Sequence, residues 1–324
     1  MSTIFSGIQP SGELHIGNYL GAVKNWVELQ DKYECIYCIV DYHAIIGSFE
    51  PADLRQRTKQ MAVSLLAAGL DPKKSTLFVQ SMVPEHTELA WIFNTVTPLG
   101  ELERQTQYKD KAQRQESVNA GLLIYPVLQA ADILLYRADL VPVGEDQVQH
   151  LELAREVARR WNAKFASDYF PEPKPLLTAT RRIMGLDGQA KMSKSLGNTI
   201  GLLESPEEVW AKLRPAMTDP ARVRRTDPGT PEVCNIYHLH KAFNDQATVE
   251  HVATQCRSAG WGCLDCKKVL MDGMMRDLGP IRARALELEA HPEVVTDALA
   301  AGAARVGEIA RRTMATVRET MGLR

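Results

Sequence analysis

Residues 3–18 of this chain read TIFSGIQPSGELHIGN and place a predicted strand directly before a predicted helix. The apolar start predicts a β-strand, the stretch Pro10–Gly12 predicts a turn, and His15 falls in the opening turn of the helix. A helix N-terminus presents unpaired N–H groups and the positive end of its dipole, so phosphate groups bind there. His15 can donate to an oxygen on which charge develops, and Gly17 lets a base or ribose lie against the helix. The segment therefore indicates a nucleotide site.

A second segment, KMSKS at residues 191–195, lies far downstream between Gly188 and Gly197. The pattern predicts a polar loop that carries Lys191 and Lys194 between glycine hinges. Such a loop can close on a pyrophosphate leaving group, where positive charge stabilises the transition state. Either segment alone is more typical of a structural feature: a histidine near a helix start is more often a solvated or capping residue, and a lysine-serine loop is usually a solvated turn. Together, and in this order, they predict the two halves of a clamp for a nucleoside triphosphate.

The composition is that of an ordinary globular protein, with 324 residues, 45% hydrophobic and 24% charged. The formal net charge of −2 argues against unspecific nucleic-acid binding, but a few well-placed arginines can still contact a specific RNA. No apolar run approaches the roughly 20 residues of a membrane span, and the predicted strand at Thr3 leaves no room for a leader peptide. We therefore expect a cytoplasmic protein without a membrane partner.

Strands and helices alternate in the first part of the chain. Residues 35–40 form an apolar run typical of a strand buried on both faces, and Asp41, Tyr42 and His43 follow at its carboxyl end, where open α/β sheets bind ligands. The pattern continues with a helix at 51–68, a strand at 76–79, a helix at 121–136 kinked at Pro126, and a strand at 140–143.

Beyond about residue 200 only helical patterns occur. We therefore predict an α/β fold: a Rossmann-like parallel-sheet catalytic domain at 1–199, followed by an all-helical domain at 200–324. We expect the last helix to pack back on the first domain.

Four segments, the first of them inside residues 3–18, are long enough to be specific: SGIQPSG at 6–12, DYH at 41–43, YPVLQAADIL at 125–134 and VPVGEDQ at 141–147. With the two clamp segments, they resemble class I aminoacyl-tRNA synthetases and, within that class, the tryptophanyl-tRNA synthetases of bacterial type. The first clamp segment ends in Asn18, where many class I synthetases have a second histidine. Asparagine is usual in the tryptophan family and is still a hydrogen-bond donor.

The resemblance implies a two-step reaction of ATP, with Mg²⁺, L-tryptophan and tRNA(Trp), carried out by a homodimer. Tryptophan attacks the α-phosphate of ATP, and the terminal ribose of the tRNA then attacks the adenylate. Matching positions imply catalytic roles for His15, Asn18, Lys111, Lys191 and Lys194. They also imply an ATP site lined by Gln9, Pro10, Ser11, Gly17, Asn18, Gly144, Glu145, Asp146, Ile183, Lys191, Met192, Ser193, Lys194 and Ser195.

The resemblance makes Asp132 the centre of amino-acid selection. A carboxylate in an apolar slot is satisfied by the indole N–H, and a ligand without that donor leaves the charge unpaired, which can discriminate by roughly 10⁴ to 10⁵. Gln129 stands where some family members have methionine, which predicts a pocket that is wetter or that reorganises on binding. The implied tryptophan site consists of Phe5, His43, Tyr125, Gln129, Asp132, Val141, Val143 and Gln147.

The cysteines fall into two groups. Cys35 and Cys38 lie three positions apart in a predicted strand, so their side chains point to opposite faces and we expect both in the core. The other four are spaced C-x₂₁-C-x₆-C-x₂-C, and on a cytosolic chain such a set holds a metal centre more often than disulfides. Spacing alone leaves zinc and an iron–sulfur cluster open.

The spacing of these four cysteines resembles that of a subset of bacterial tryptophanyl-tRNA synthetases with a [4Fe–4S] cluster in the anticodon-binding domain. The resemblance implies a cluster, with zinc as the second candidate, on Cys234, Cys256, Cys263 and Cys266. Lys267 and Lys268 adjoin these cysteines and predict a loop that meets the tRNA anticodon. We expect His238 and His240 to be ordinary helix residues.

Three other functions are weighed against tryptophan–tRNA ligation. A tyrosine-specific relative would share both clamp segments, but Asp132 in its context favours tryptophan. A smaller adenylyltransferase would lack the lysine loop and the helical domain. A non-catalytic paralogue that binds tRNA or a partner protein would show erosion of the clamp segments, and both are intact here.

Overall fold

The computed structural model describes residues 1–105, 108–109, 118–144, 148–177 and 183–324. Its centre is a parallel sheet of five strands in the order β3-β2-β1-β4-β5. The strand order reverses between β1 and β4, and at such a switch point the carboxyl ends of the strands leave a crevice for ligands. The strands are β1 (Thr3–Ile8), β2 (Glu34–Ile39), β3 (Ser75–Val79), β4 (Leu140–Val143) and β5 (Lys174–Leu177).

Strand β2 shows how the sheet separates two hydrophobic cores. Cys35 and Tyr37 belong to the core on one face, whereas Ile36 and Cys38 belong to the core on the other face. This alternation follows from the two-residue period of a strand. The expectation that Cys35 and Cys38 are core residues on opposite faces is therefore confirmed.

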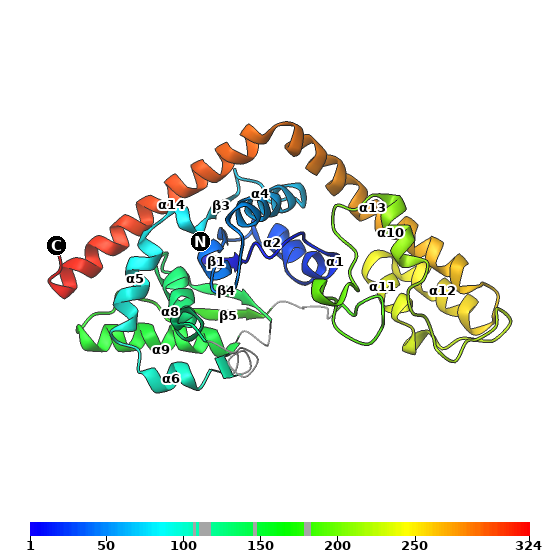
Figure 1. Ribbon diagram of the computed structural model, residues 1–324, viewed down its shortest axis with the longest axis horizontal. Helices are drawn as coiled ribbons and strands as arrows, with labels where there is room; N and C mark the ends of the chain where they lie inside the picture. The colour runs from blue at the N-terminus through cyan, green and yellow to red at the C-terminus, as the bar shows by residue number, and fades with distance from the viewer. Residues whose placement is uncertain (106–107, 110–117, 145–147, 178–182) are drawn as a thin grey trace.

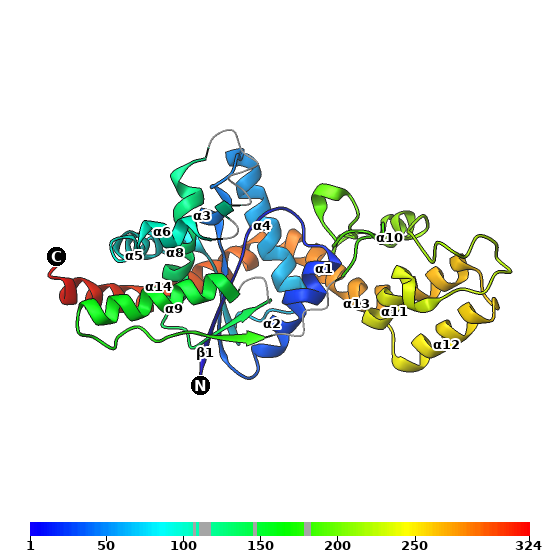
Figure 2. The same cartoon turned by 90° about the horizontal axis from the view of Figure 1, so that it is seen from below.

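Helices cover both faces of the sheet (Figures 1 and 2). The short α3 (Asp41–Ala44) continues directly from the end of β2, and η2 (Gln80–Met82), a 3₁₀ turn, continues from β3. One core includes residues of α1 (Ile16–Asn18), a π-helical turn (Tyr19–Val23), α2 (Lys24–Leu29) and α4 (Pro51–Ala67). The other core includes residues of α5 (Glu85–Asn94), α6 (Leu99–Glu103), α8 (Ala120–Leu134) and α9 (Val148–Lys164).

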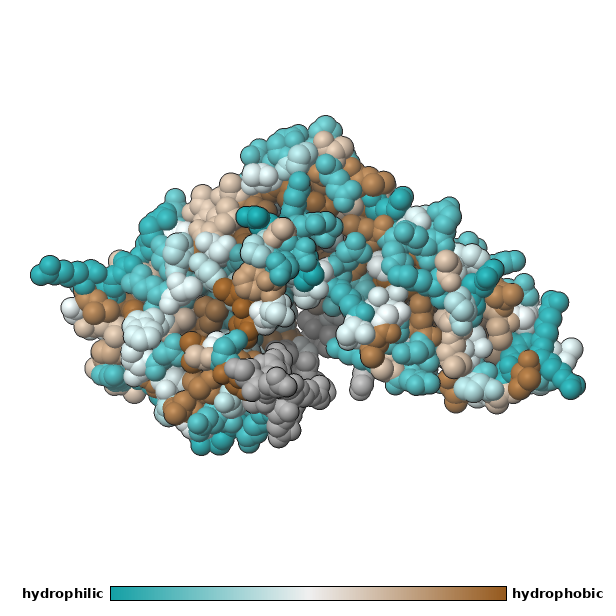
Figure 3. All heavy atoms as spheres, in the orientation of Figure 1, coloured by the Kyte–Doolittle hydropathy of each residue, from teal (hydrophilic) through white to brown (hydrophobic). Residues whose placement is uncertain are grey.

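The chain beyond residue 200 is helical in its described part, and the stretch from residue 206 into the first half of the long helix that starts at Cys263 forms a second body beside the sheet (Figure 1). In the space-filling view the face of the helical part that is shown is mostly hydrophilic, with scattered hydrophobic residues (Figure 3). The predicted α/β class with a helical C-terminal part is confirmed. The elements of this part are α10 (Pro206–Leu213), the 3₁₀ turn η5 (Pro231–Val233), α11 (Asn235–Phe243), α12 (Gln246–Arg257), α13 (Cys263–Ala290) and α14 (Pro292–Met321).

Helix α14 returns from the second body and runs back along the sheet to β3 (Figure 1). The approach is close because Gly302 faces the β3 backbone: a Cβ at this position would lie 2.0 Å from the carbonyl oxygen of Leu77. Val306 and Met314 of the same helix are buried in the core that contains α5 and α8. The last helix thereby ties the two bodies together.

Strand β5 is an element that the sequence pattern did not predict. It has only four residues, one of them Pro175, and it lies at the edge of the sheet beside β4. Proline is tolerated at such an edge, because an edge strand has one side without ladder hydrogen bonds. Neither length nor alternation therefore marks β5 as a strand.

Candidate active site

A cavity of about 280 Å³ opens where β1 and β4 separate. Strand β1 contributes Phe5, β4 contributes Val141 and Val143, and α8 contributes Tyr125 and Asp132. His43 and Gln129 complete the described part of the predicted tryptophan site, so all of that part lines one cavity. The other lining residues are Ser6, Gly7, Gln9, Val40, Ile133 and Pro142, of which Gln9 was expected at the ATP site.

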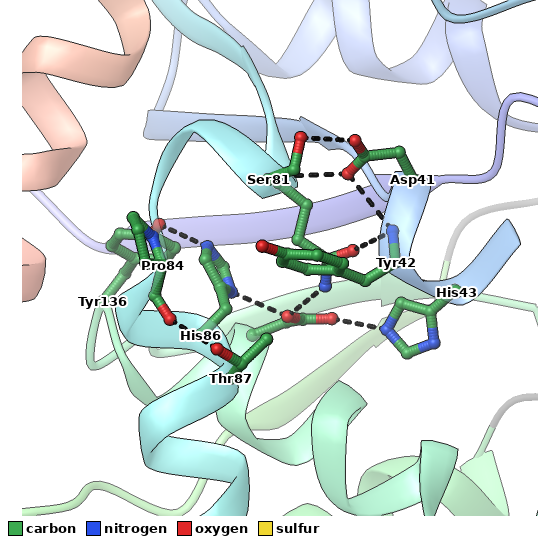
Figure 4. Close-up of polar contacts among 10 residues, drawn as sticks. Asp41, Tyr42, His43, Ser81, Pro84, His86, Thr87 and Tyr136 are labelled. Carbon is green, nitrogen blue, oxygen red and sulfur yellow. Dashed lines mark hydrogen bonds and ion pairs between the residues drawn. The ribbon is translucent and has the colours of Figure 1, made fainter. Parts of the chain in front are cut away.

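Asp132 is the buried polar centre of this cavity, with an exposed fraction of 1%. Its Oδ2 lies 2.7 Å from His43 Nε2, and its Oδ1 lies 2.6 Å from Gln80 Nε2 and 2.7 Å from His86 Nδ1 (Figure 4). Burial alone raises the pKa of the Asp132 carboxyl, but the charge of His43 and the hydrogen bonds from His43 and His86 outweigh burial and hold that pKa below its usual range. The cavity therefore presents an ionised acceptor.

Gln80 and His86 were not predicted from the sequence. Gln80 directly follows β3, so the rule that singled out Asp41 to His43 after β2 would also have found it. His86 lies in the first turn of α5, and its Nε2 lies 2.6 Å from the Tyr136 hydroxyl. No sequence pattern marks this contact, because it joins residues 50 positions apart.

His15 is the N-cap of α1. Its Nδ1 accepts hydrogen bonds from the N–H groups of Gly17 (3.1 Å) and Asn18 (3.3 Å), and Asn18 Oδ1 accepts one from the His15 N–H (3.2 Å). Because Nδ1 is an acceptor, the ring proton of neutral His15 is on Nε2. Burial, and then the charges of Lys194 and Lys191, lower the pKa of His15 to about 4. His15 is therefore a neutral N–H donor at pH 7.

The two clamp segments lie side by side. Ile16 N–H donates to Ile200 O (3.0 Å) and Leu202 N–H donates to Leu14 O (2.7 Å), which joins the His15 turn to the chain that follows the lysine loop. Lys194 Nζ reaches the carbonyl oxygen of Ser11 at 3.4 Å. The segments that the sequence predicted as one phosphate clamp are thus in contact.

Asn198 shapes the lysine loop and was not predicted. Its Oδ1 accepts from Ser193 N–H (2.8 Å), and its Nδ2 donates to Asp187 Oδ2 (2.9 Å) and Lys191 O (3.5 Å). Asn198 is buried and lies after the loop, so its side chain joins the two ends of the loop from the protein interior. The lysines Lys191 and Lys194 stay exposed.

The remaining described residues of the predicted ATP site lie in or just before the lysine loop, in the turn after β1, and after β4. Met192 is buried and donates its N–H to Ile183 O at 3.1 Å, and Ser193 Oγ lies 3.0 Å from Ser195 Oγ. Pro10 lies buried in the turn after β1, and Gly144 directly follows β4. Four predicted site residues lie outside the described residues: Lys111, Glu145, Asp146 and Gln147.

A second cavity, of about 20 Å³, lies in the helical body and is lined by all four cysteines of the predicted metal set. Cys234 caps α11, Cys256 lies in α12, and Cys263 and Cys266 lie in the first turn of α13. Burial, and then the charges of the other three cysteines, raise the pKa of Cys266 to about 12. Within the described part of the chain, no three His, Cys, Asp or Glu side chains are arranged to hold a metal ion.

His240 corrects one expectation about this region. His240 is fully buried, and its Nε2 lies 3.3 Å from Cys266 Sγ and 3.2 Å from Cys266 O. It is therefore in direct contact with one of the four cysteines and is not only a helix residue. Arg276 donates to Asn244 Oδ1 (2.7 Å), which turns Asn244 Nδ2 toward His240 Nδ1 (2.9 Å). His240 Nε2 therefore carries the ring proton and points it at the Cys266 thiol.

Lys267 corrects a second expectation. Its segment was predicted to be a loop that meets the tRNA anticodon, but Lys267 lies near the start of helix α13. The Lys267 side chain is buried, and Nζ donates to the carbonyl oxygens of Arg214 and Ala216, both at 2.7 Å. Its ammonium stabilises the end of the α10 segment from inside the protein. Lys268 is exposed, so of this pair only Lys268 faces solvent.

Comparisons with known proteins agree with this geometry. Residues 1–277 match the family described as tRNA synthetases class I (W and Y). Two tryptophan–tRNA ligases cover 99% of this chain and 99% of their own length: that of Deinococcus radiodurans is 56% identical and that of Thermotoga maritima 44% identical. A crystal structure of tryptophanyl-tRNA synthetase from Campylobacter jejuni, complexed with ADP and tryptophan, has 37% identity and a TM-score of 0.92, and covers 99% of this chain and 100% of that chain.

The fold and the paired clamp segments define a class I synthetase, and the chain belongs to the class I tRNA synthetases of the tryptophan and tyrosine family. Within that family its activity is that of a tryptophan–tRNA ligase. The resemblance to bacterial tryptophanyl-tRNA synthetases is confirmed, whereas membership of the four-cysteine cluster subset stays a prediction. No helix in the described ranges is long and apolar enough to cross a membrane.

Proposed function

We propose that the cavity between β1 and β4 binds L-tryptophan and that the His15 turn and the lysine loop bind the phosphates of ATP. One observation carries this proposal: an ionised, buried carboxylate, Asp132, lines a cavity at the carboxyl ends of the strands whose walls also include the apolar side chains of Phe5 and Val141. An indole supplies a flat apolar ring and a single N–H donor, which match that cavity. The relative from Campylobacter jejuni was crystallised with ADP and tryptophan, which supports the same pair of ligands.

In the first step, a carboxylate oxygen of tryptophan forms a bond to the α-phosphorus of ATP. The bond from that phosphorus to the bridging oxygen of the β-phosphate breaks, and pyrophosphate leaves with the electron pair. His15 donates Nε2–H to a phosphate oxygen, and Lys191 and Lys194 close on the leaving pyrophosphate. Mg²⁺ held by the phosphates supplies further positive charge there when it is bound.

In the second step, a hydroxyl of the terminal ribose of tRNA(Trp) attacks the carbonyl carbon of the adenylate, and AMP leaves. We also propose that the enzyme acts as a homodimer in the cytoplasm, as the enzyme family implies. Sedimentation of the purified chain at micromolar concentration would give the mass of two chains. A single-chain mass with full charging activity would reject the dimer and leave the chemistry unaffected.

Amino-acid-dependent exchange between ATP and pyrophosphate tests the central proposal. We expect exchange with tryptophan and very little with tyrosine or phenylalanine, and we expect Asp132→Ala to lose most of the preference for tryptophan. Asp132→Asn keeps the shape of the side chain but can turn an amide donor toward the ligand. It should therefore lose as much of the preference for tryptophan as Asp132→Ala does. Exchange that is equally fast with tyrosine would overturn the assignment of the cavity.

We further propose that Cys234, Cys256, Cys263 and Cys266 hold a [4Fe–4S] cluster. The support is their common cavity together with the surrounding donors: His240 points an N–H at Cys266, and Arg222 Nη1 lies 3.9 Å from Cys256 Sγ. The Nε–H of Arg222 is buried and has no hydrogen-bond partner among the described residues. A buried donor without a partner beside four thiols fits an anionic sulfur-rich group.

Zinc is the second candidate, because four thiolates also satisfy Zn²⁺. The preference for the cluster rests on the family resemblance and on the donors that face the cysteines, the Nε–H of Arg222 and the Nε2–H of His240. A bound cluster would cross-link α11, α12 and α13 near the exposed Lys268.

Anaerobic purification followed by iron, sulfide and zinc analysis decides between the [4Fe–4S] cluster and a zinc ion. We expect about four irons and four sulfides per chain, a brown colour, and loss of both in Cys263→Ala. Cys35→Ala is the matched control, because Cys35 is buried in the core beside the sheet and outside the cysteine cavity. Stoichiometric zinc without iron in the anaerobic protein would reject the cluster.

A further inference from the structure

The hydrogen bonds around Asp132 are distributed unequally over its two oxygens. Oδ1 has two donors, Gln80 Nε2 at 2.6 Å and His86 Nδ1 at 2.7 Å, whereas Oδ2 has only His43 Nε2 at 2.7 Å (Figure 4). A carboxylate oxygen has two lone pairs. Oδ1 is therefore saturated, and Oδ2 is the oxygen with an acceptor position left for a ligand.

The donors behind the carboxylate are held by a second set of contacts. Tyr42 N–H donates to Gln80 Oε1 at 3.1 Å, which turns the Gln80 amide nitrogen toward Asp132. A carboxylate can only accept, so His86 donates through Nδ1, and a neutral His86 ring then accepts the Tyr136 hydroxyl at Nε2 (2.6 Å). The chain of hydrogen bonds runs from Tyr136 through His86 to Asp132.

His86 and Tyr136 do not belong to the described lining of the tryptophan cavity, whereas Asp132 and His43 do. The Tyr136 ring is fixed by packing, because it stacks on Phe5 at 5.7 Å and meets Phe78 edge-on at 5.8 Å. His86 is fully buried and stacks on Phe78 at 5.9 Å. The pair is thus rigid and lies behind the carboxylate, out of reach of a ligand in the cavity.

We propose that His86 and Tyr136 are positioning residues for amino-acid selection: they occupy Oδ1 of Asp132 so that Oδ2 alone meets the indole N–H of tryptophan. This inference rests on the proposed role of Asp132. Without the His86 donor, Oδ1 is left with Gln80 alone and the carboxylate can rotate. A carboxylate that rotates forms a weaker hydrogen bond with the indole N–H. The selectivity for tryptophan therefore falls, although the cavity keeps its shape.

His86 also affects the ionisation of Asp132. The titratable groups that face this carboxylate are Cys38 from β2, His43 from α3, His86 from α5 and Tyr136 beyond the end of α8. Loss of the His86 hydrogen bond removes one contribution that lowers the pKa of Asp132, so that pKa rises. A protonated carboxyl can donate to a ligand oxygen, and selectivity would therefore weaken further at acid pH.

The test compares tryptophan with benzothienylalanine, in which sulfur replaces the indole N–H. The readout is the ratio of kcat/KM for the two amino acids in ATP–pyrophosphate exchange. We expect His86→Leu to reduce this ratio by about tenfold or more, because a hydrogen bond to a charged group is lost. His86→Asn places an amide donor where Nδ1 was and should restore most of the ratio. Tyr136→Phe should give a smaller loss of the ratio, and the acid limb of the kcat/KM profile should shift to higher pH in His86→Leu.

Controls separate this inference from stability and from the role of Asp132. Tyr37→Phe removes another buried hydroxyl, which bonds Trp26 O at 2.9 Å on the opposite face, so it should lower the thermal midpoint without changing the ratio. The KM for ATP should be unchanged in every variant. If Asp132→Ala keeps the wild-type ratio, the proposed role of Asp132 fails. If Asp132→Ala loses the wild-type ratio but His86→Leu and Tyr136→Phe keep it, the positioning role is wrong. The positioning role is also wrong if the ratio is as low in His86→Asn as in His86→Leu.

Discussion

At the scale of single residues, Gly17 shows why the His15 turn tolerates no side chain. A Cβ at position 17 would lie 2.9 Å from Cε1 and Nδ1 of His15, so Gly17→Ala must push the ring off the N–H groups that it caps. We predict that kcat/KM for ATP falls by about tenfold or more, because each lost hydrogen bond contributes about 1 kcal/mol. Gly47→Ala is the control, since its Cβ would meet no atom within 4 Å. Equal activity of the two variants would contradict the role given to the turn.

The ionisation of His15 gives a second prediction at this scale. Its pKa is about 4 in the folded chain and 6.5 in an ordinary histidine, so between these values the unfolded chain binds more protons. The contribution of His15 to stability is therefore complete above pH 6.5 and is lost as the pH falls toward 4. We predict a steeper fall of the thermal midpoint between pH 6.5 and 4.5 in the wild type than in His15→Asn, which caps the helix but does not titrate. Parallel curves would show that His15 titrates normally.

At the scale of elements, the lysine loop depends on the single amide of Asn198. Without its hydrogen bonds to Ser193 N–H and Asp187, the loop loses the support that aims its lysines. We predict that Asn198→Ala lowers kcat for exchange by about tenfold or more with a smaller change in the KM for tryptophan. Asn162→Ala is the control, because Asn162 ties its own loop through Phe170 N–H and O, away from the clamp. An equal drop in kcat in both variants would show that Asn198 only stabilises the fold and does not position the lysines.

The contrast between predicted and unpredicted elements has a physical basis. The strands β1 to β4 and the helices around them could be predicted from apolar runs and from turn residues, and the carboxyl-end rule located His43 in the cavity. Contacts that set the chemistry join distant positions: Gln80 meets Asp132 across 52 positions, and His240 meets Cys266 across 26. Such contacts depend on how strands and helices pack, which no local pattern encodes. Family resemblance supplied Asp132, but not the donors behind it.

At the scale of the whole molecule, α14 joins the helical body to the sheet, and this joint rests on Gly302. A Cβ there would lie 2.0 Å from the Leu77 carbonyl oxygen and 2.9 Å from its carbon, and both atoms belong to the backbone of β3. Gly302→Ala must therefore lift the helix from the sheet, at a cost of about 1–3 kcal/mol that exceeds the gain of up to about 1 kcal/mol in helix propensity.

We predict that Gly302→Ala lowers the thermal midpoint by about 2 °C or more. Gly307→Ala, in the same helix, should leave it unchanged or raise it. There the nearest atom to a new Cβ is Arg311 Nη1 at 3.2 Å, the mobile end of a side chain that can move aside. Because the cavity and the clamp lie elsewhere on the sheet, exchange by folded Gly302→Ala should keep its KM for tryptophan and for ATP. Calorimetry of the two variants side by side measures the difference, and a Gly302→Ala protein as stable as Gly307→Ala would show that α14 does not dock as closely as described.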